Sequence, residues 1–164
     1  MQYKVGLGYD IHRLIEGRPL FLGAVQIPYS KGLLGHSDGD ALIHALCDAL
    51  LGALGLGDIG EHFPDTDPQY QGMASSKLLM AVKGLVERSG YKINNLDLIV
   101  IAQEPSLVPF KKQMKENISS LLGIAQEAVN IKAKTNEGLG AVGTKEAIAA
   151  YAVVTLIVKE SALA

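Results

Sequence analysis

The sequence has no tryptophan, a single cysteine, and only six tyrosines and three phenylalanines among its 164 residues. A lone cysteine excludes an intrachain disulfide, and the apolar surroundings of Cys47 favour a small buried side chain over a nucleophile. With so few aromatic rings, the core has to be packed with Leu, Ile, Val and Ala. A chain of this length supports one hydrophobic core, so we predict a single domain over residues 1–164.

Neither a strong charge imbalance nor a long hydrophobic run is present. Lys and Arg number 15 against 17 Asp and Glu, which argues against the basic surface that nucleic acid or an anionic membrane requires. The longest predominantly apolar run, residues 147–158, is shorter than the roughly 20 residues that cross a bilayer, and the start of the chain lacks a signal-peptide core. We predict no nucleic-acid partner, no membrane association, and a cytoplasmic location, or a plastid-type compartment after removal of a transit peptide that this sequence does not contain.

Hydrophobic periodicity predicts an alternation of strands and helices. The strands are predicted at residues 5–12, 20–27, 97–103, 129–135 and 147–159, and the helices at 39–54, 75–88 and 109–122. Ser37 or Asp38 is predicted to cap the first helix, and Ser75 or Ser76 the second. Residues 55–72 read as a long ordered loop.

These elements predict an α+β fold, a mixed and mainly antiparallel sheet with helices on one face, because no Gly-rich dinucleotide fingerprint accompanies them. A sheet covered on one side leaves its second face to water or to another subunit. The apolar composition favours the subunit, so we predict an oligomer.

Three polar side chains stand out within these elements. Alternation along residues 5–12 places Asp10 and His12 on the same face of a strand, and His44 lies inside an apolar helix. One carboxylate and two imidazoles suit Zn²⁺ and leave one tetrahedral position open. The spacing alone is also compatible with a structural interpretation, in which Asp10 and His12 are solvated strand residues and His44 is a hydrogen-bonded core residue. Asp48, one turn beyond His44, either orients a ligand or faces a partner chain.

Six motifs follow one another in the chain: GYDIH at 8–12, GHSDGD at 35–40, GDIG at 57–60, FPDTDP at 63–68, IAQEP at 101–105 and KAKTNE at 132–137. In this order they resemble the 2-C-methyl-D-erythritol 2,4-cyclodiphosphate synthase family of the non-mevalonate isoprenoid pathway. The resemblance spans roughly residues 5–159.

The resemblance implies a two-metal phosphoryl-transfer site. Asp10, His12 and His44 would bind Zn²⁺ or a similar divalent ion whose open position takes a substrate phosphate, and Glu137 would hold Mg²⁺ or Mn²⁺ on the diphosphate. His36, Ser37 and Thr135 would bind the reacting phosphates, with His36 and Thr135 as the catalytic pair. Asp58 and Gly60 would meet the polyol hydroxyls, Asp65 and Asp67 lie in the loop over the site, and Lys134 would add positive charge near the nucleotide phosphates. The cytosine would be bound by Ala102, Pro105, Ser106, Leu107 and Val108. The remaining implied substrate contacts are Ile59, Phe63 and Asn136. Without the resemblance, the acidic loop residues read as ordinary turn formers and Glu137 as a solvated side chain.

The implied reaction is intramolecular. The 2-phosphate of 4-diphosphocytidyl-2-C-methyl-D-erythritol 2-phosphate attacks the β-phosphate and releases CMP. The resemblance also implies a homotrimer with active sites between subunits and an apolar channel on its axis. Ala141 and Thr144 stand where many members carry an aromatic residue and an arginine, which puts binding of an isoprenoid diphosphate in that channel in doubt.

Two other functions are compatible with the same residues. A zinc-dependent nucleotide hydrolase would activate water at the open metal position, but no residue is an obvious general base for it. A non-catalytic trimer that binds cytidine nucleotides would need no metal chemistry.

Overall fold

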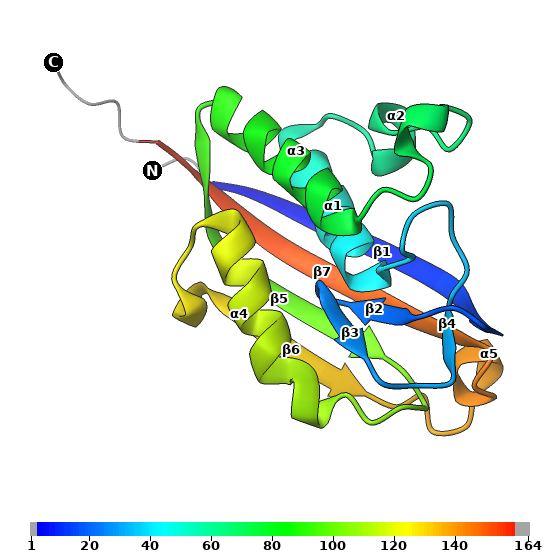
Figure 1. The fold of residues 1–164 in the computed structure, drawn as a ribbon. Coiled ribbons are helices and arrows are strands. Elements are labelled where there is room, and N and C mark those ends of the chain that lie inside the picture. The colour runs from blue at the N-terminus through cyan, green and yellow to red at the C-terminus, as the bar shows by residue number, and fades with distance from the viewer. Residues whose placement is uncertain (1–2, 160–164) are drawn as a thin grey trace, which may run out of the picture.

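The computed structural model describes residues 3–159 and forms one five-stranded sheet with three long helices on one of its faces (Figure 1). Along the sheet the strands are β4 (Lys31–Leu33), β1 (Tyr3–Glu16), β7 (Ala147–Val158), β5 (Tyr91–Ile101) and β6 (Val129–Lys134). All neighbours are antiparallel except the parallel pair β5 and β6. The prediction of an α+β fold with a mixed, mainly antiparallel sheet is confirmed.

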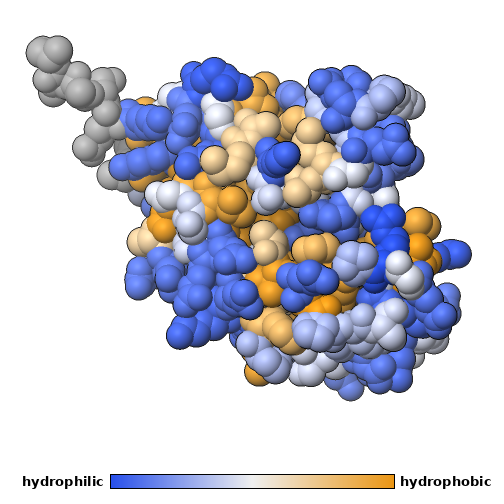
Figure 2. Space-filling model, viewed as in Figure 1, coloured by the Kyte–Doolittle hydropathy of each residue, from blue (hydrophilic) through white to orange (hydrophobic). Residues whose placement is uncertain are grey.

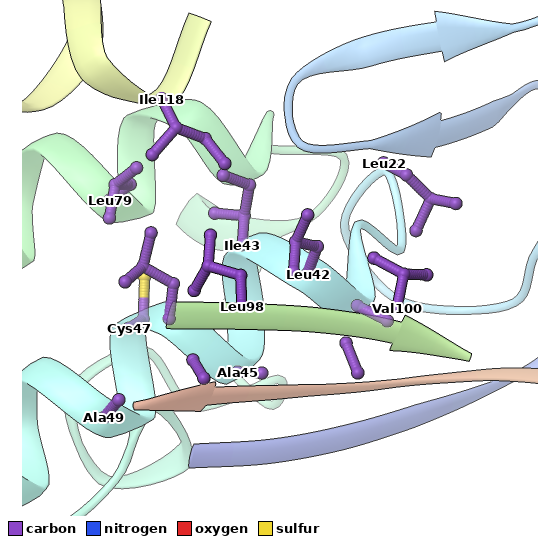
Figure 3. Close-up of a cluster of buried hydrophobic side chains, with 14 of the residues drawn as sticks. Leu22, Leu42, Ile43, Ala45, Cys47, Ala49, Leu79, Leu98, Val100 and Ile118 are labelled. Carbon is purple, nitrogen blue, oxygen red and sulfur yellow. The ribbon is translucent and has the colours of Figure 1, made fainter. Parts of the chain in front are cut away.

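The helices pack their apolar sides onto the sheet. The long ones are α1 (Ala41–Leu54), α3 (Ser75–Arg88) and α4 (Lys111–Leu122), and the short ones α2 (Ile59–His62), α5 (Gly140–Gly143) and the 3₁₀ turns η1 (Pro68–Tyr70), η2 (Val108–Phe110) and η3 (Gln126–Ala128). Figure 3 shows where α1, α3 and α4 meet β5, with labelled side chains that include Leu42, Ile43, Cys47, Leu79, Leu98, Val100 and Ile118. Each fully buried Leu or Ile contributes about 1.5–3 kcal/mol. Cys47 is a packing residue of this core, as predicted, and burial raises the pKa of its thiol.

Helix α1 lies unusually close to the sheet because β1 presents glycines to it. A Cβ atom on Gly6 would lie 1.8 Å from the carbonyl oxygen of Ala49, and one on Gly8 would lie 1.9 Å from that of Ala45. Any larger residue would therefore overlap the helix backbone. Ala45 and Ala49 form the side of α1 that faces the strands (Figure 3), so small residues on both elements permit the close approach.

Several local predictions were wrong. Residues 20–27 form two strands, β2 (Leu20–Leu22) and β3 (Val25–Ile27), because Gly23 and Ala24 both take positive φ and reverse the chain. The cap of α1 is Asp40, whose carboxylate accepts the N–H groups of Ile43, Gly23 and Ala24 and ties the hairpin to the helix.

The second wrong cap is that of α3, whose first turn has no capping side chain of its own; the carboxylate of Asp38 accepts the N–H of Ser75 instead. The remaining errors concern the lengths of elements. Residues 55–72 are not all loop but include α2 and η1, and β5 begins six residues before its predicted start.

The face of the sheet opposite the helices is apolar and exposed in the single chain. The alternation along β1 turns its glycines toward α1 and its large side chains away from it. The exposed side chains on this free face include Val5, Leu7, Tyr9 and Ile11 of β1 and Tyr151 and Val153 of β7. On the helix-covered face, by contrast, hydrophilic residues cover α4 and the region of α2 (Figure 2).

Within residues 3–159, no helix combines the length and apolar character needed to span a membrane.

Candidate metal centre

Asp10, His12 and His44 converge on one point. The Oδ2 atom of Asp10 lies 2.8 Å from Nε2 of His12 and 3.0 Å from Nδ1 of His44, and the two ring nitrogens are 3.1 Å apart. Among the described residues these three form the single cluster of His, Cys, Asp and Glu whose ligand atoms could share a metal ion. The predicted convergence of a strand pair and a helix histidine is confirmed.

The convergence follows from local structure. Asp10 and His12 continue the glycine face of β1, so they point toward α1, and the close approach of α1 brings His44 against them. His44 itself is buried. The Nδ1–H of His12 donates to the carbonyl oxygen of Leu34 at 2.6 Å, which turns its Nε2 toward the centre.

The charges at the centre favour a bound cation. Burial raises the pKa of Asp10, but hydrogen bonding and charge at the adjacent imidazoles of His12 and His44 outweigh it and hold that pKa at about 2. Burial lowers the pKa of His12, and the hydrogen bond and charge of Asp10 outweigh it and raise that pKa. The carboxylate of Asp10 is therefore ionised, and its negative charge stabilises positive charge at this centre. A divalent ion satisfies the same need with one carboxylate oxygen and two imidazole nitrogens, so the donor set fits Zn²⁺ or a similar ion.

A cavity of about 490 Å³ opens beside these ligands. Its lining includes the predicted residues Asp10, His12, His36, Ser37, His44, Ile59, Gly60, Phe63 and Asp65. His36 and Asp65 lie beside each other in this lining, with 3.5 Å between Nε2 and Oδ2, and both are largely exposed. The structure therefore brings together three of the four predicted metal ligands, one of the two predicted catalytic residues and several of the predicted substrate contacts.

The acidic loop residues have structural contacts of their own. Asp58 caps α2 by accepting the N–H of Glu61, and Asp67 accepts the N–H of Gln69. Asp48 does not hydrogen-bond to His44. Its carboxylate accepts the N–H of Ile59 at 2.9 Å, which anchors α2, one wall of the cavity, to α1.

Most of the other predicted residues line a second, separate cavity of about 270 Å³. Its lining includes Ala102, Pro105, Ser106, Leu107, Val108, Lys134 and Thr135, and shares no residue with the first. Glu137 lies next to it and accepts the hydroxyl of Thr135 at 2.9 Å, while the side-chain amide of Asn136 donates to the carbonyl oxygen of Leu139.

The sheet separates the two cavities within one chain. Across the sheet, Asp10 on β1 pairs with Ala150 on β7, which pairs with Val100 on β5, which pairs with Ala133 on β6. Strand β6 leads into Thr135. Three strand spacings amount to about 14 Å. A phosphate bound to Asp10, His12 and His44 therefore does not meet Thr135 of the same chain through direct contact.

Sequence reasoning missed several residues of the site. Tyr70 and Leu78 line the first cavity, and Tyr70 packs edge-on against Phe63 with ring centroids 5.4 Å apart. No local pattern marks either one, because they reach the cavity through the path of the loop and α3. Asp38 and Ser75 were predicted only as helix caps, although the hydroxyl of Ser75 hydrogen-bonds to His44 and to the carboxylate of Asp38.

A mixed sheet with one helical layer and a preformed Asp-His-His cluster beside a cavity defines an α+β protein whose site could hold a divalent metal ion. Comparison with known proteins narrows this class. The chain belongs to the YgbB family, whose model matches residues 3–157.

Individual relatives agree with this membership. The chain is 56% identical over 153 residues to the 2-C-methyl-D-erythritol 2,4-cyclodiphosphate synthase of Agathobacter rectalis, covering 93% of this chain and 86% of that protein. A solved 2C-methyl-D-erythritol-2,4-cyclodiphosphate synthase in a CDP-bound form is 44% identical with a TM-score of 0.87, covering 94% of this chain and all of that one. The bifunctional IspDF of Campylobacter jejuni is 43% identical with a TM-score of 0.93, and the match covers 97% of this chain and 43% of that one. The resemblance drawn from the six motifs is confirmed.

Proposed function

We propose that the chain is a 2-C-methyl-D-erythritol 2,4-cyclodiphosphate synthase, a cyclising, CMP-releasing phosphorus–oxygen lyase that depends on metal ions. The 2-phosphate oxygen of the cytidyl substrate forms a bond to the β-phosphorus, and the bond from that phosphorus to the oxygen of the departing CMP breaks. The observation that carries the proposal is the convergence of Asp10, His12 and His44 beside a cavity, in a chain that matches proteins of this name over nearly its whole length.

The attacking phosphate is already ionised, so the chain has to supply charge and orientation more than a general base. A divalent cation bound by Asp10, His12 and His44 supplies positive charge that offsets the repulsion between the two phosphates. His36 and Ser37 line the same cavity and orient the reacting phosphates by donating hydrogen bonds. The α2 wall, anchored by Asp48, positions Ile59 and Gly60 for the polyol.

The second cavity supplies the remaining contacts. Its walls offer backbone groups for cytosine, and Thr135 and Lys134 offer a hydroxyl and an ammonium group for the nucleotide phosphates. Glu137 offers a carboxylate for Mg²⁺ or Mn²⁺. No cluster of three potential ligands among residues 3–159 includes Glu137, so phosphate, water or a second copy has to complete that ion's shell.

We also propose that the protein acts as a homotrimer. One substrate has to meet both cavities, which the sheet holds apart within one chain, and an exposed apolar face lies opposite the helices. Packing these faces together buries that surface and sets the first cavity of one copy against the second cavity of the next. The cytoplasm or a plastid-type compartment stays the predicted location.

Product analysis tests the proposed reaction. With the cytidyl substrate, Zn²⁺ and Mg²⁺, phosphorus NMR is expected to show CMP and a cyclic diphosphate appearing in equal amounts. CMP with an open-chain bisphosphate would identify a nucleotide hydrolase. Nucleotide binding without any turnover would identify a non-catalytic cytidine-binding protein, and either result contradicts the proposal.

The assembly is tested by mass and by a face variant. Light scattering is expected to give three times the chain mass of 17.4 kDa. Leu7→Lys places a charge at a side chain that is 67% exposed in the single chain, so each copy is expected to fold while assembly and turnover are both lost. A fully active monomer would show that one chain completes the site alone.

A further inference from the structure

His44 can act as a metal ligand through Nδ1 only if its other ring nitrogen holds the proton. The carboxylate of Asp10, 3.0 Å from Nδ1, attracts the ring proton to Nδ1, where the proton would block metal binding. Something on the opposite side of the ring has to hold a proton on Nε2. Two hydroxyl groups lie there, Ser75 Oγ at 2.9 Å and Ser37 Oγ at 3.1 Å.

A hydroxyl by itself does not decide the tautomer, because it can donate or accept. Ser75 is different because its Oγ also bonds to Oδ1 of Asp38. An ionised carboxylate only accepts hydrogen bonds, so the hydroxyl proton of Ser75 goes to Asp38. The lone pair of Ser75 then faces His44 and accepts the Nε2–H. Nδ1 is left with its own lone pair, aimed at the metal centre.

The carboxylate of Asp38 is held firmly in this orientation. Its Oδ2 accepts the N–H of Ser75 at 3.0 Å, and its Oδ1 accepts the N–H of Asp40 at 3.2 Å. The first of these bonds is also the cap of α3, where the helix dipole favours a negative charge. Ser75 is completely buried, so no water competes for its hydroxyl. The loop before α1 and the start of α3 thus meet at the back of His44.

We infer that Asp38 and Ser75 are positioning residues that fix the tautomer and orientation of His44, and thereby set the affinity of the Asp10–His12–His44 centre for a divalent cation. The inference rests on the proposed metal site. It assigns a task to two residues that are outside the predicted metal ligands and substrate contacts. Hydrogen-bond partners behind a metal-ligating histidine typically contribute about 10- to 100-fold in affinity.

The test uses Ser75→Ala and Asp38→Asn, with Ser76→Ala as the matched control on the same helix. Zn²⁺ affinity is measured by competition with a chromophoric chelator. The first two variants are expected to bind Zn²⁺ about 10- to 100-fold more weakly than the wild type, and the control to bind it equally well. Thermal unfolding confirms that each variant is folded. Binding within about twofold of the wild type in both variants overturns the inference.

A second readout separates this inference from the metal site itself. Nitrogen-15 NMR of the metal-free protein reports which ring nitrogen of His44 is protonated. The proton is expected on Nε2 in the wild type, and its occupancy there is expected to fall in both variants as Asp10 draws it to Nδ1. A wild-type Nε2 without a proton overturns the inference. If the wild type binds no Zn²⁺ while Nε2 is protonated as expected, the metal proposal fails and the tautomer assignment stands.

Discussion

Replacing His44 with alanine is expected to lower metal-dependent turnover by about 1000-fold or more. The imidazole supplies one of the three atoms that converge on the cation position, and its loss leaves Asp10 and His12 too few to hold an ion tightly. Metal assistance to phosphoryl transfer contributes several kcal/mol, and each 1.4 kcal/mol corresponds to a factor of ten in rate. Steady-state kinetics with saturating substrate, over a range of Zn²⁺ concentrations, measures the effect.

Packing loss has to be separated from ligand loss in this experiment. Cys47→Ala removes a different buried side chain from the same helix, and Cys47 contacts the core instead of the metal centre. We expect it to cost about 1 kcal/mol of stability and to leave turnover unchanged. Turnover in the His44→Ala variant within a few fold of the wild type would remove the metal centre from the mechanism.

Replacing Gly8 with alanine is expected to destabilise the protein by at least about 3 kcal/mol or to prevent folding. The added Cβ would lie 1.9 Å from the carbonyl oxygen of Ala45, and neither backbone can yield without separating β1 from α1. Because this contact brings His44 to Asp10, the variant is also expected to lose Zn²⁺ binding. Urea unfolding and the zinc competition assay measure the two effects.

The matched control is Gly52→Ala on α1, the helix that Gly8 contacts. A Cβ at Gly52 would meet only the carbonyl oxygen of Leu7 at 3.9 Å, an ordinary contact distance. Alanine has the higher helix propensity, so this variant is expected to be neutral or more stable by up to about 1 kcal/mol. Equal stability of the Gly8→Ala and Gly52→Ala variants would show that the close approach of α1 is not required.

Sequence reasoning succeeded where a signal is local and periodic. The alternation around Asp10 and His12 predicted a strand with both side chains on one face, and the apolar stretch around His44 predicted a buried helix. The existence of α1, α3, α4 and β6 followed from the same kind of pattern, and that of β7 from the β-branched residues near its end. Convergence of the three ligands was chemically plausible from spacing alone, and the six motifs made it specific.

Features that depend on distant contacts were not accessible in this way. Asp38 caps a helix that begins 37 residues later, and no local rule links the two. The hairpin at Gly23 and Ala24 depends on the carboxylate of Asp40, which holds both turn amides. The alternation along β1 also does not show which of its faces the helices cover. Helix α1 covers the glycine face, whereas the face with the large apolar side chains is exposed in the single chain.

Anomalous diffraction at the zinc absorption edge, from crystals grown with Zn²⁺, tests the central claim most directly. The account predicts one strong peak bonded to a carboxylate oxygen of Asp10, Nε2 of His12 and Nδ1 of His44, at about 2.0–2.2 Å from each. A peak held by other residues, or no peak at this position at saturating Zn²⁺, would contradict it.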